Sequence, residues 1–190
     1  MPDTAAKGFS LIEVLVAIFV LALGVIGAAG MQLAALRSTT QSAFQSVAVQ
    51  LAGELADKMR ANAASAKLKT ADNLYLGIDF QNVSESDSSL SKFCYADTCN
   101  SQELAQFDIH LWQRKLAAVL PGARALVCRD AEPWSASAQA FTWDCDSRGG
   151  TSSLVIKIGW QGKNMDGTLI RDDAKRSPPG VALVVEPTAP

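Results

Sequence analysis

The sequence holds few residues whose types and spacing could do chemistry. Glu13 stands at the start of a long apolar run, and a carboxylate at the centre of a bilayer costs roughly 2.5–3.5 kcal/mol on insertion scales. Such a charge needs a cationic partner, so Glu13 is a candidate functional residue. His110 is the only histidine of the chain, and one histidine supports neither a histidine-based metal site nor a convincing triad. An exposed position on a helix is its favoured interpretation.

The cysteines form a second set. There are four, all downstream of the apolar run, and they allow three disulfide connectivities: Cys94, Cys99, Cys128 and Cys145. We favour Cys94–Cys99 and Cys128–Cys145, because the members of each pair are close in sequence and could staple one loop or hairpin. A four-cysteine zinc site is the alternative, but the cysteines do not form the two closely spaced pairs that are typical of such sites.

The remaining candidates are acidic. A loop that includes Asn164, Asp166, Asp172 and Asp173 could hold calcium, but the residue order of an EF-hand is absent. A solvated loop is the favoured interpretation. No phosphate-binding loop and no G-x-S-x-G motif occurs, so we expect no catalytic residue, no metal and no cofactor. The formal net charge of −2 argues against a large electrostatic footprint for nucleic acid.

A long helix must position Glu13. Residues 14–31 carry no charge, and this length is enough to cross ~30 Å of hydrocarbon at ~1.5 Å per residue. Beyond them an apolar stripe recurs at spacings of three and four: Leu33, Leu36, Thr40, Phe44, Val47, Leu51, Leu55 and Met59. No proline interrupts residues 9–66, which predicts one continuous helix. We expect its first half to be a membrane segment or filament core and its second half to be the spine of a soluble domain. Glu54 and Lys58 stand at i,i+4 in the favourable order.

The rest of the chain predicts a second helix and a sheet. Asn100 or Ser101 can cap the helix, and Pro121-Gly122 ends it. Its wide apolar face is formed by Leu104, Phe107, Ile109, Leu111, Trp112, Leu116, Val119 and Leu120. Short runs rich in β-branched and aromatic residues then predict antiparallel strands at residues 123–128, 141–145, 154–161 and 181–185. Alternation within residues 154–161 predicts one buried face, packed against the stripe of the long helix. The fold class is therefore α+β.

The residues Gly8-Phe9-Ser10-Leu11-Ile12-Glu13, followed by the apolar helix, resemble the prepilin signature of type IV pilins and type II secretion pseudopilins. The resemblance implies that a prepilin peptidase cuts after Gly8 and methylates Phe9, and that Glu13 neutralises the amino terminus of a neighbouring subunit. It also implies the type IV pilin fold, in which a long N-terminal helix packs on an antiparallel sheet.

A second resemblance is more specific. The short cysteine loop, followed by a helix with Asp108 and Trp112 that ends in Leu120-Pro121-Gly122, is similar to the middle of PilV-type minor pilins. This resemblance implies a minor pilin that helps to start pilus assembly and lies near the pilus tip. Its implied partners are other minor and major pilins, the prepilin peptidase and the inner membrane, with a large pilus-tip adhesin as a further candidate.

These inferences predict three parts: a leader at residues 1–8, a transmembrane or filament-core helix at residues 9–36, and a periplasmic globular domain at residues 37–190. The amino terminus would be cytoplasmic, and the chain would later reach the pilus at the cell surface. A type II secretion minor pseudopilin is the first alternative. A membrane-tethered periplasmic enzyme or binding protein is a lower one, because a plain tether gains nothing from Glu13. A signal peptide cut near Ala28-Ala29-Gly30 is disfavoured by the length of the run and by Glu13.

Overall fold

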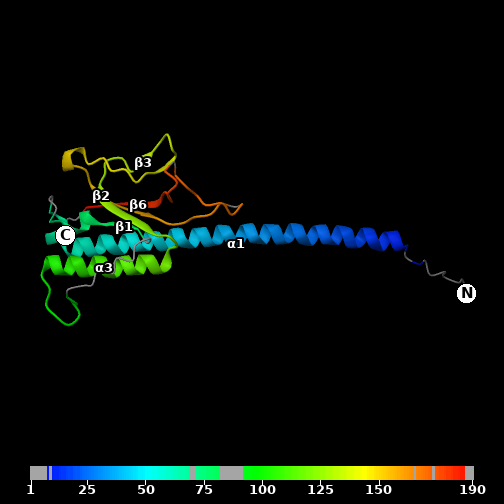
Figure 1. Cartoon of the computed structure of the whole chain (residues 1–190), viewed down its shortest axis with the longest axis horizontal. Helices are drawn as coiled ribbons and strands as arrows, with labels where there is room; N and C mark the ends of the chain where they lie inside the picture. The colour runs from blue at the N-terminus through cyan, green and yellow to red at the C-terminus, as the bar shows by residue number, and fades with distance from the viewer. Residues whose placement is uncertain are drawn as a thin grey trace, which may run out of the picture. The chain divides into compact units, whose positions relative to one another are not determined.

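The computed structural model describes residue 8 and residues 10–68, 72–81, 92–164, 166–172 and 174–186. The chain divides into two compact units, Met1–Thr40 and Gln41–Pro190. Helix α1 (Leu11–Ala61) begins in the first unit, and every other helix and strand belongs to the second. In the second unit two helices pack with an antiparallel sheet (Figure 1). The predicted α+β fold, a long N-terminal helix on a sheet with a second helix, is confirmed.

The C-terminal part of α1 is the spine of the second unit. Because its apolar residues recur every three or four positions, one side of it is buried. The buried residues are Ala48, Leu51, Ala52, Leu55, Ala56 and Met59. The packed stripe starts at the partly buried Phe44. Leu33 and Leu36, which the periodicity places on the same stripe, are exposed instead.

The long helix ends earlier than predicted, at Ala61, and a separate turn, α2 (Ala63–Ala66), follows. Asn62 lies between them with a non-helical backbone, φ −110° and ψ 51°. Its side-chain amide donates to the carbonyl of Ser101 at 2.7 Å. Asparagine side chains readily take hydrogen bonds that compete with the helix. The prediction of one continuous helix over residues 9–66 is therefore wrong beyond Ala61.

The second helix, α3 (Ser101–Val119), has the predicted boundaries. Asn100 is its N-cap, and the carboxylate of Glu103 accepts the backbone N–H of Asn100 at 2.9 Å, which completes a capping box. The helix ends just before Pro121, which cannot continue it. Trp112 is fully buried, and its indole N–H donates to the carbonyl of Leu51 in α1 at 2.8 Å. This tryptophan fixes the position of α3 along α1.

Two ion pairs join α1 to α3. Lys58 bonds to Asp108 at 2.7 Å, and Lys115 bonds to Glu54 at 2.6 Å. The expected i,i+4 pair between Glu54 and Lys58 is not formed, because each side chain reaches across to the neighbouring helix. Both pairs are partly exposed, so each contributes only about 0–1 kcal/mol to stability. Their main effect is to favour one register between the helices.

Four strands form one antiparallel sheet in the order β1-β2-β5-β6. They are β1 (Asp79–Gln81), β2 (Arg124–Arg129), β5 (Leu154–Gly159) and β6 (Pro179–Val185). β2, β5 and β6 confirm three of the predicted strands, whereas β1 lies where the sequence shows no clear pattern.

The fourth predicted strand, at residues 141–145, is wrong. Of its five residues only Phe141 is part of a strand. It belongs to β4 (Ala140–Phe141), which pairs with β3 (Trp134–Ser135) in a short hairpin. The rest of the segment is irregular. The ring of Trp143 there is buried, and its N–H donates to the carbonyl of Ser177 at 2.9 Å rather than to a strand. A short apolar run can thus form an irregular segment that packs over a sheet, as well as a strand within it.

The structure contains two disulfides, Cys94–Cys99 and Cys128–Cys145, which are the two pairs favoured from the sequence. All four cysteines are thereby used. The first disulfide closes the loop before α3. That loop is also held by Lys92, which bonds to Glu103 at 3.0 Å. The N–H of Asn100, together with the Lys92 ammonium, holds the pKa of Glu103 below its ordinary value.

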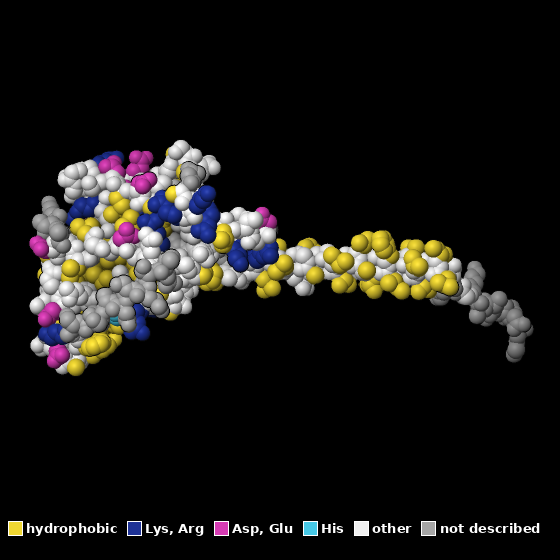
Figure 2. Space-filling view, viewed as in Figure 1, with side chains coloured by type: hydrophobic (Ala, Val, Ile, Leu, Met, Phe, Trp, Pro, Cys, Tyr) yellow, Lys and Arg dark blue, Asp and Glu magenta, His cyan; other side chains and the backbone are white. Residues whose placement is uncertain are grey.

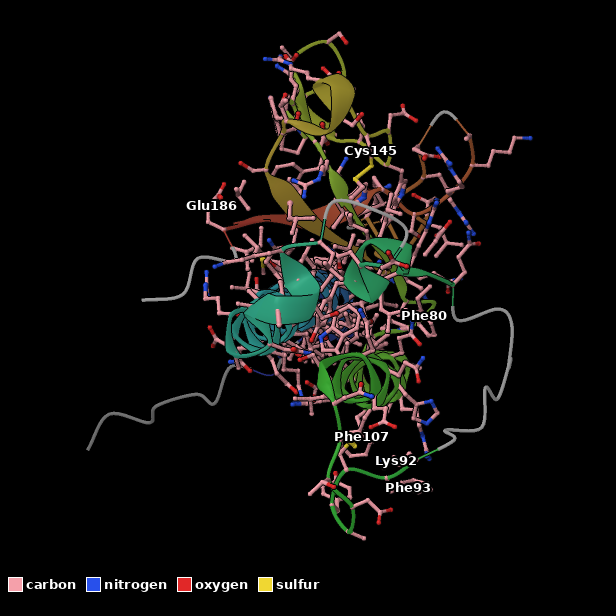
Figure 3. All side chains as sticks on the ribbon, turned by 90° about the vertical axis from the view of Figure 1, so that its left-hand side faces the viewer. Phe80, Lys92, Phe93, Phe107, Cys145 and Glu186 are labelled. Atoms are coloured by element: carbon pink, nitrogen blue, oxygen red, sulfur yellow. A yellow bond between two sulfur atoms is a disulfide. The ribbon has the colours of Figure 1, made fainter. Side chains whose placement is uncertain are left out.

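Both faces of β5 are buried, which corrects the expectation of one buried face. Alternate residues of β5 belong to the same core as α1 and α3. On the other face, Val155 and Lys157 are also fully buried. Figure 3 shows Cys145 on the side of the sheet away from α3, where its disulfide ties the segment after the hairpin to β2. This segment covers the second face of the sheet.

A buried ion pair anchors that cover. The Nζ of Lys157 lies 2.6 Å from Oδ2 of Asp130, and both side chains are almost fully buried, at 0 % and 1 % exposed. The ammonium also donates to the backbone carbonyls of Thr142 and Asp144. Burial raises the pKa of Asp130, but the Lys157 hydrogen bond and two backbone N–H groups outweigh this, and the net pKa is lowered. The ionised pair therefore belongs to the folded state.

We expect Asp130→Asn to destabilise the protein by about 3–5 kcal/mol at pH 7, because it leaves a buried ammonium without its counter-charge. Stability from a carboxyl with a lowered pKa is present above the unfolded value of about 3.9 and is lost as the pH falls through the folded value. The difference from the wild type should therefore narrow below about pH 4. Urea unfolding at pH 7 and pH 3 measures the free-energy difference between the variant and the wild type at each pH. Asp97→Asn, at an exposed position, is the control. Equal stability of Asp130→Asn and the wild type at pH 7 would contradict this role.

Candidate functional site

The N-terminal part of α1 is apolar and open to solvent. Its large apolar side chains from Leu11 to Leu36 are between 48 % and 85 % exposed. Figure 2 shows yellow side chains along this part of the helix on the face in view. Among the described residues, α1 is the one helix long and apolar enough to cross a membrane. An apolar surface of this extent marks contact with lipid or with other proteins.

The helix has the amino acids that close helix packing needs. Gly24, Gly27 and Gly30 have open space where a side chain would stand, so no contact within the described chain requires them. Glycine costs a helix up to ~1 kcal/mol relative to alanine in water. In a bilayer, small residues let helices approach closely, and Gly24 with Ala28 makes one small-xxx-small pair. These positions are suited to contacts with other helices.

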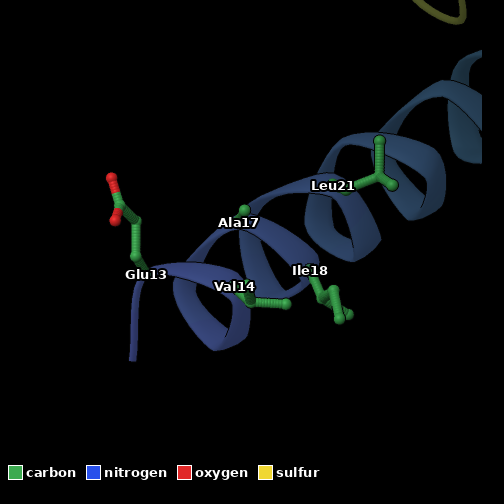
Figure 4. A pocket seen from close by; sticks show the side chains of 5 residues that line it. All are labelled: Glu13, Val14, Ala17, Ile18 and Leu21. Atoms are coloured by element: carbon green, nitrogen blue, oxygen red, sulfur yellow. The ribbon is translucent and has the colours of Figure 1, made fainter. Parts of the chain in front are cut away.

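Glu13 lies in the first turn of α1. It forms one end of a shallow groove of about 250 Å³ whose other lining residues are Val14, Ala17, Ile18 and Leu21 (Figure 4). Within the described part of the chain its carboxylate has no hydrogen-bond or ion-pair partner. The positive end of the helix dipole lies close to it, but that is worth only about 0.3–1 kcal/mol. In an apolar environment Glu13 therefore needs a cation from elsewhere.

The other predicted processing residues flank this turn. Gly8 is exposed, and a Cβ atom added to it would meet no other heavy atom within 4 Å. Phe9 lies outside the described residues, so the structure places neither its side chain nor its amine. The backbone carbonyl of Ser10 accepts the N–H groups of Glu13 and Val14 at 3.0 and 3.3 Å. The helix thus begins at Leu11, three residues after Gly8.

The remaining candidates form no reactive centre. Asp166 accepts hydrogen bonds from Thr168, and Asp172 pairs with Arg176 at 3.1 Å. Asp173, the last member of the proposed calcium loop, lies outside the described residues. Among the described residues no three His, Cys, Asp or Glu side chains could hold a metal ion. His110 is half-buried on α3 rather than fully exposed.

Sequence reasoning missed one further feature, a depression of about 550 Å³ beside the β3–β4 hairpin. Trp134 and the carboxylates Glu132 and Asp144 line it. The ring of Trp134 packs edge-on against Phe141, 5.2 Å away. These residues come from two segments that the sheet brings together, so no local motif could reveal them.

Two comparisons with protein families match the chain. A family described as type IV pilin Tt1218, Tt1218-like, matches residues 30–110. The prokaryotic N-terminal methylation motif matches residues 4–29, which include Gly8, Phe9 and Glu13. No curated protein and no solved structure matches the chain. Together the two family matches cover the apolar helix, the spine of the second unit and the first part of α3.

Proposed function

This chain belongs to the type IV pilin-like family, and we propose that it acts as a minor pilin of a type IV pilus. The observation that carries the proposal is the exposed, uncharged part of α1 with Glu13 at its start and no partner for that carboxylate in the described chain. Such a helix is suited to a membrane before assembly and to a bundle of like helices after it. Type IV pilins are structural proteins, and the proposal assigns this chain a structural role.

The proposal assigns a role to each part of the chain. Residues 1–8 are a leader that prepilin peptidase removes after Gly8, and Phe9 becomes the methylated amino terminus. Residues 9–36 cross the inner membrane once and later form the filament core. Residues 37–190 are the periplasmic domain, in which two disulfides can persist. The match to the methylation motif supports the first of these roles.

Glu13 would act by charge pairing. After cleavage the amine of Phe9 and the carboxylate of Glu13 stand at i,i+4 on one helix, so they can pair within a chain that waits in the membrane. On assembly, Glu13 exchanges this partner for the amine of an adjacent subunit. In apolar surroundings either charge alone is costly, so this exchange fixes the axial step between neighbouring subunits.

The specific assignment to PilV-type minor pilins, which start assembly near the pilus tip, rests on α3. Asp108 and Trp112, which carry the resemblance, both bond from α3 to α1. Their spacing therefore encodes how the second helix docks on the spine, which is a property of the fold and not of a surface loop. Partners would be other minor and major pilins, and a tip adhesin. A type II secretion minor pseudopilin is the alternative within the family.

We expect the mature chain to begin with Phe9 carrying one methyl group on its amine. Mass spectrometry of the chain purified from membranes measures this directly. The control is the same chain from cells without prepilin peptidase, which should keep residues 1–8. A mature chain that begins near Ala29 or Gly30 would establish a cleaved signal peptide and exclude the minor pilin.

We expect Glu13→Gln to leave membrane insertion intact, because it removes a charge that is costly in the bilayer. Association with other pilin subunits should fall by about tenfold or more, because the neighbour's amine loses its counter-charge. Subunit crosslinking and surface piliation of a complemented deletion strain measure this. Glu132→Gln, in an exposed carboxylate of the domain, is the matched control. Wild-type crosslinking and piliation by Glu13→Gln would show that the carboxylate has no assembly role.

The same deletion strain separates a pilin from a pseudopilin. Loss of surface pili with protein secretion intact supports the pilin. Loss of secretion with pili intact supports the pseudopilin.

A further inference from the structure

The outer edge of β6 is an unpaired strand. β6 is the last strand of the sheet, and all its ladder bonds go to β5. In the described part of the chain, the backbone of residues 181–185 bonds to no other segment. The start of the strand is covered, because the side-chain amide of Gln45 donates to the carbonyl of Gly180 at 3.0 Å. β4 also packs close to β6, without a backbone hydrogen bond to residues 181–185 in the described part of the chain. Among the described residues, the outer edge of β6 at residues 181–185 therefore presents backbone donors and acceptors that bond to no other segment.

The two edges of the sheet are treated differently. Natural sheets protect their edges with short strands, charges or proline. β1 follows this rule, since it has three residues and its exposed Asp79 stands 3.8 Å from Arg124. β6 is protected in this way only at its start, where Pro179 stands and the register with β5 shifts. Its residues 181–185 are all Val, Ala or Leu, and Val184 is 51 % exposed. An unprotected apolar edge of this kind pairs readily with another strand, which points to a partner in the functional state.

We infer that β6 accepts the edge strand of a different pilin-like subunit, which extends the sheet across the contact. The occupant follows from the chemistry of the edge, because only an extended strand satisfies a row of alternating N–H and C=O groups. The inference rests on the proposed function, which supplies subunits of the same fold. It adds a contact in the domain to the contact through α1.

The direction of the partner follows from the topology. Each strand runs antiparallel to its neighbour in the order β1-β2-β5-β6, so β6 runs opposite to β1. A neighbouring subunit in the same orientation therefore offers its first strand antiparallel to β6. The helices of the two subunits then run in the same direction, as insertion into one membrane requires. The sheet continues with regular antiparallel pairing.

A second copy of this chain fits less well. Antiparallel pairing of β6 with its own counterpart, the more stable arrangement per residue, needs a two-fold axis perpendicular to the sheet. That axis reverses the part of α1 that packs on the sheet, and two such chains cannot both enter a membrane from one side. Head-to-tail pairing would use this chain's own β1, which is three residues long and carries Asp79. A different subunit with a longer edge strand is the better partner.

The test uses the full chain in detergent, alone and in complex with the coexpressed pilin-like subunits of its own cell. Amide hydrogen exchange of residues 181–185 is measured in both states. We expect protection of the outward-facing amides to rise about tenfold or more in the complex. Val184→Lys places a charge on the exposed edge and should abolish this gain. Val119→Lys makes the same change at a position 41 % exposed on α3, and should leave the gain intact.

Other results would overturn the inference. If a complex forms but the hydrogen exchange of residues 181–185 is unchanged, the proposed strand pairing is wrong, whereas the proposal of a minor pilin is unaffected. Protection that appears in the isolated chain and rises with its concentration assigns the edge to a second copy. If Val184→Lys keeps the full gain, the protection has another cause. If the wild-type chain forms no complex with any pilin-like subunit, both the proposed minor-pilin function and the proposed strand pairing are contradicted.

Discussion

The structure depends on one constraint, which is that a single helix must satisfy two different surroundings. Residues 14–31 of α1 carry no charge, and their apolar side chains are open on all sides. Residues 48–59 of the same helix present a narrow buried stripe to α3 and the sheet. A helix that is apolar all round needs lipid or other helices, and a helix with one apolar stripe needs a domain. The change of pattern along α1 divides the chain into its two units.

The domain is built to hold the striped part of α1 in one register. Trp112 donates to the backbone of α1, and along α3 it lies between Asp108 and Lys115, which pair with Lys58 and Glu54 of α1. A buried tryptophan contributes through its apolar area and through a hydrogen bond at a fixed distance. Nonpolar packing alone would let α3 slide along α1, since apolar contacts have little direction. The polar contacts remove this freedom.

Sequence patterns predicted those parts of the fold that depend on local periodicity and capping. The stripe through Leu51 and Leu55, the Asn100 cap and the Pro121 stop are local signals, and they were right. The break at Asn62 and the burial of Lys157 were not predictable, because each depends on a partner far away in the sequence. Glu13 was identified by the mismatch between its charge and its surroundings. The partner proposed for it, the amine of a processed Phe9, comes from the family resemblance, and Phe9 lies outside the described residues.

The two proposed contacts between subunits would have different physical characters. The apolar part of α1 can pack against any similar helix, and the charge of Glu13 requires only an amine that every processed pilin would carry. Neither feature distinguishes one subunit from another. The edge of β6 is different, because backbone hydrogen bonds fix register, and the side chains beside Val184 must match those of the incoming strand. The helix would thus supply a general affinity for pilins, and the strand edge would select the neighbour beside which this subunit is incorporated.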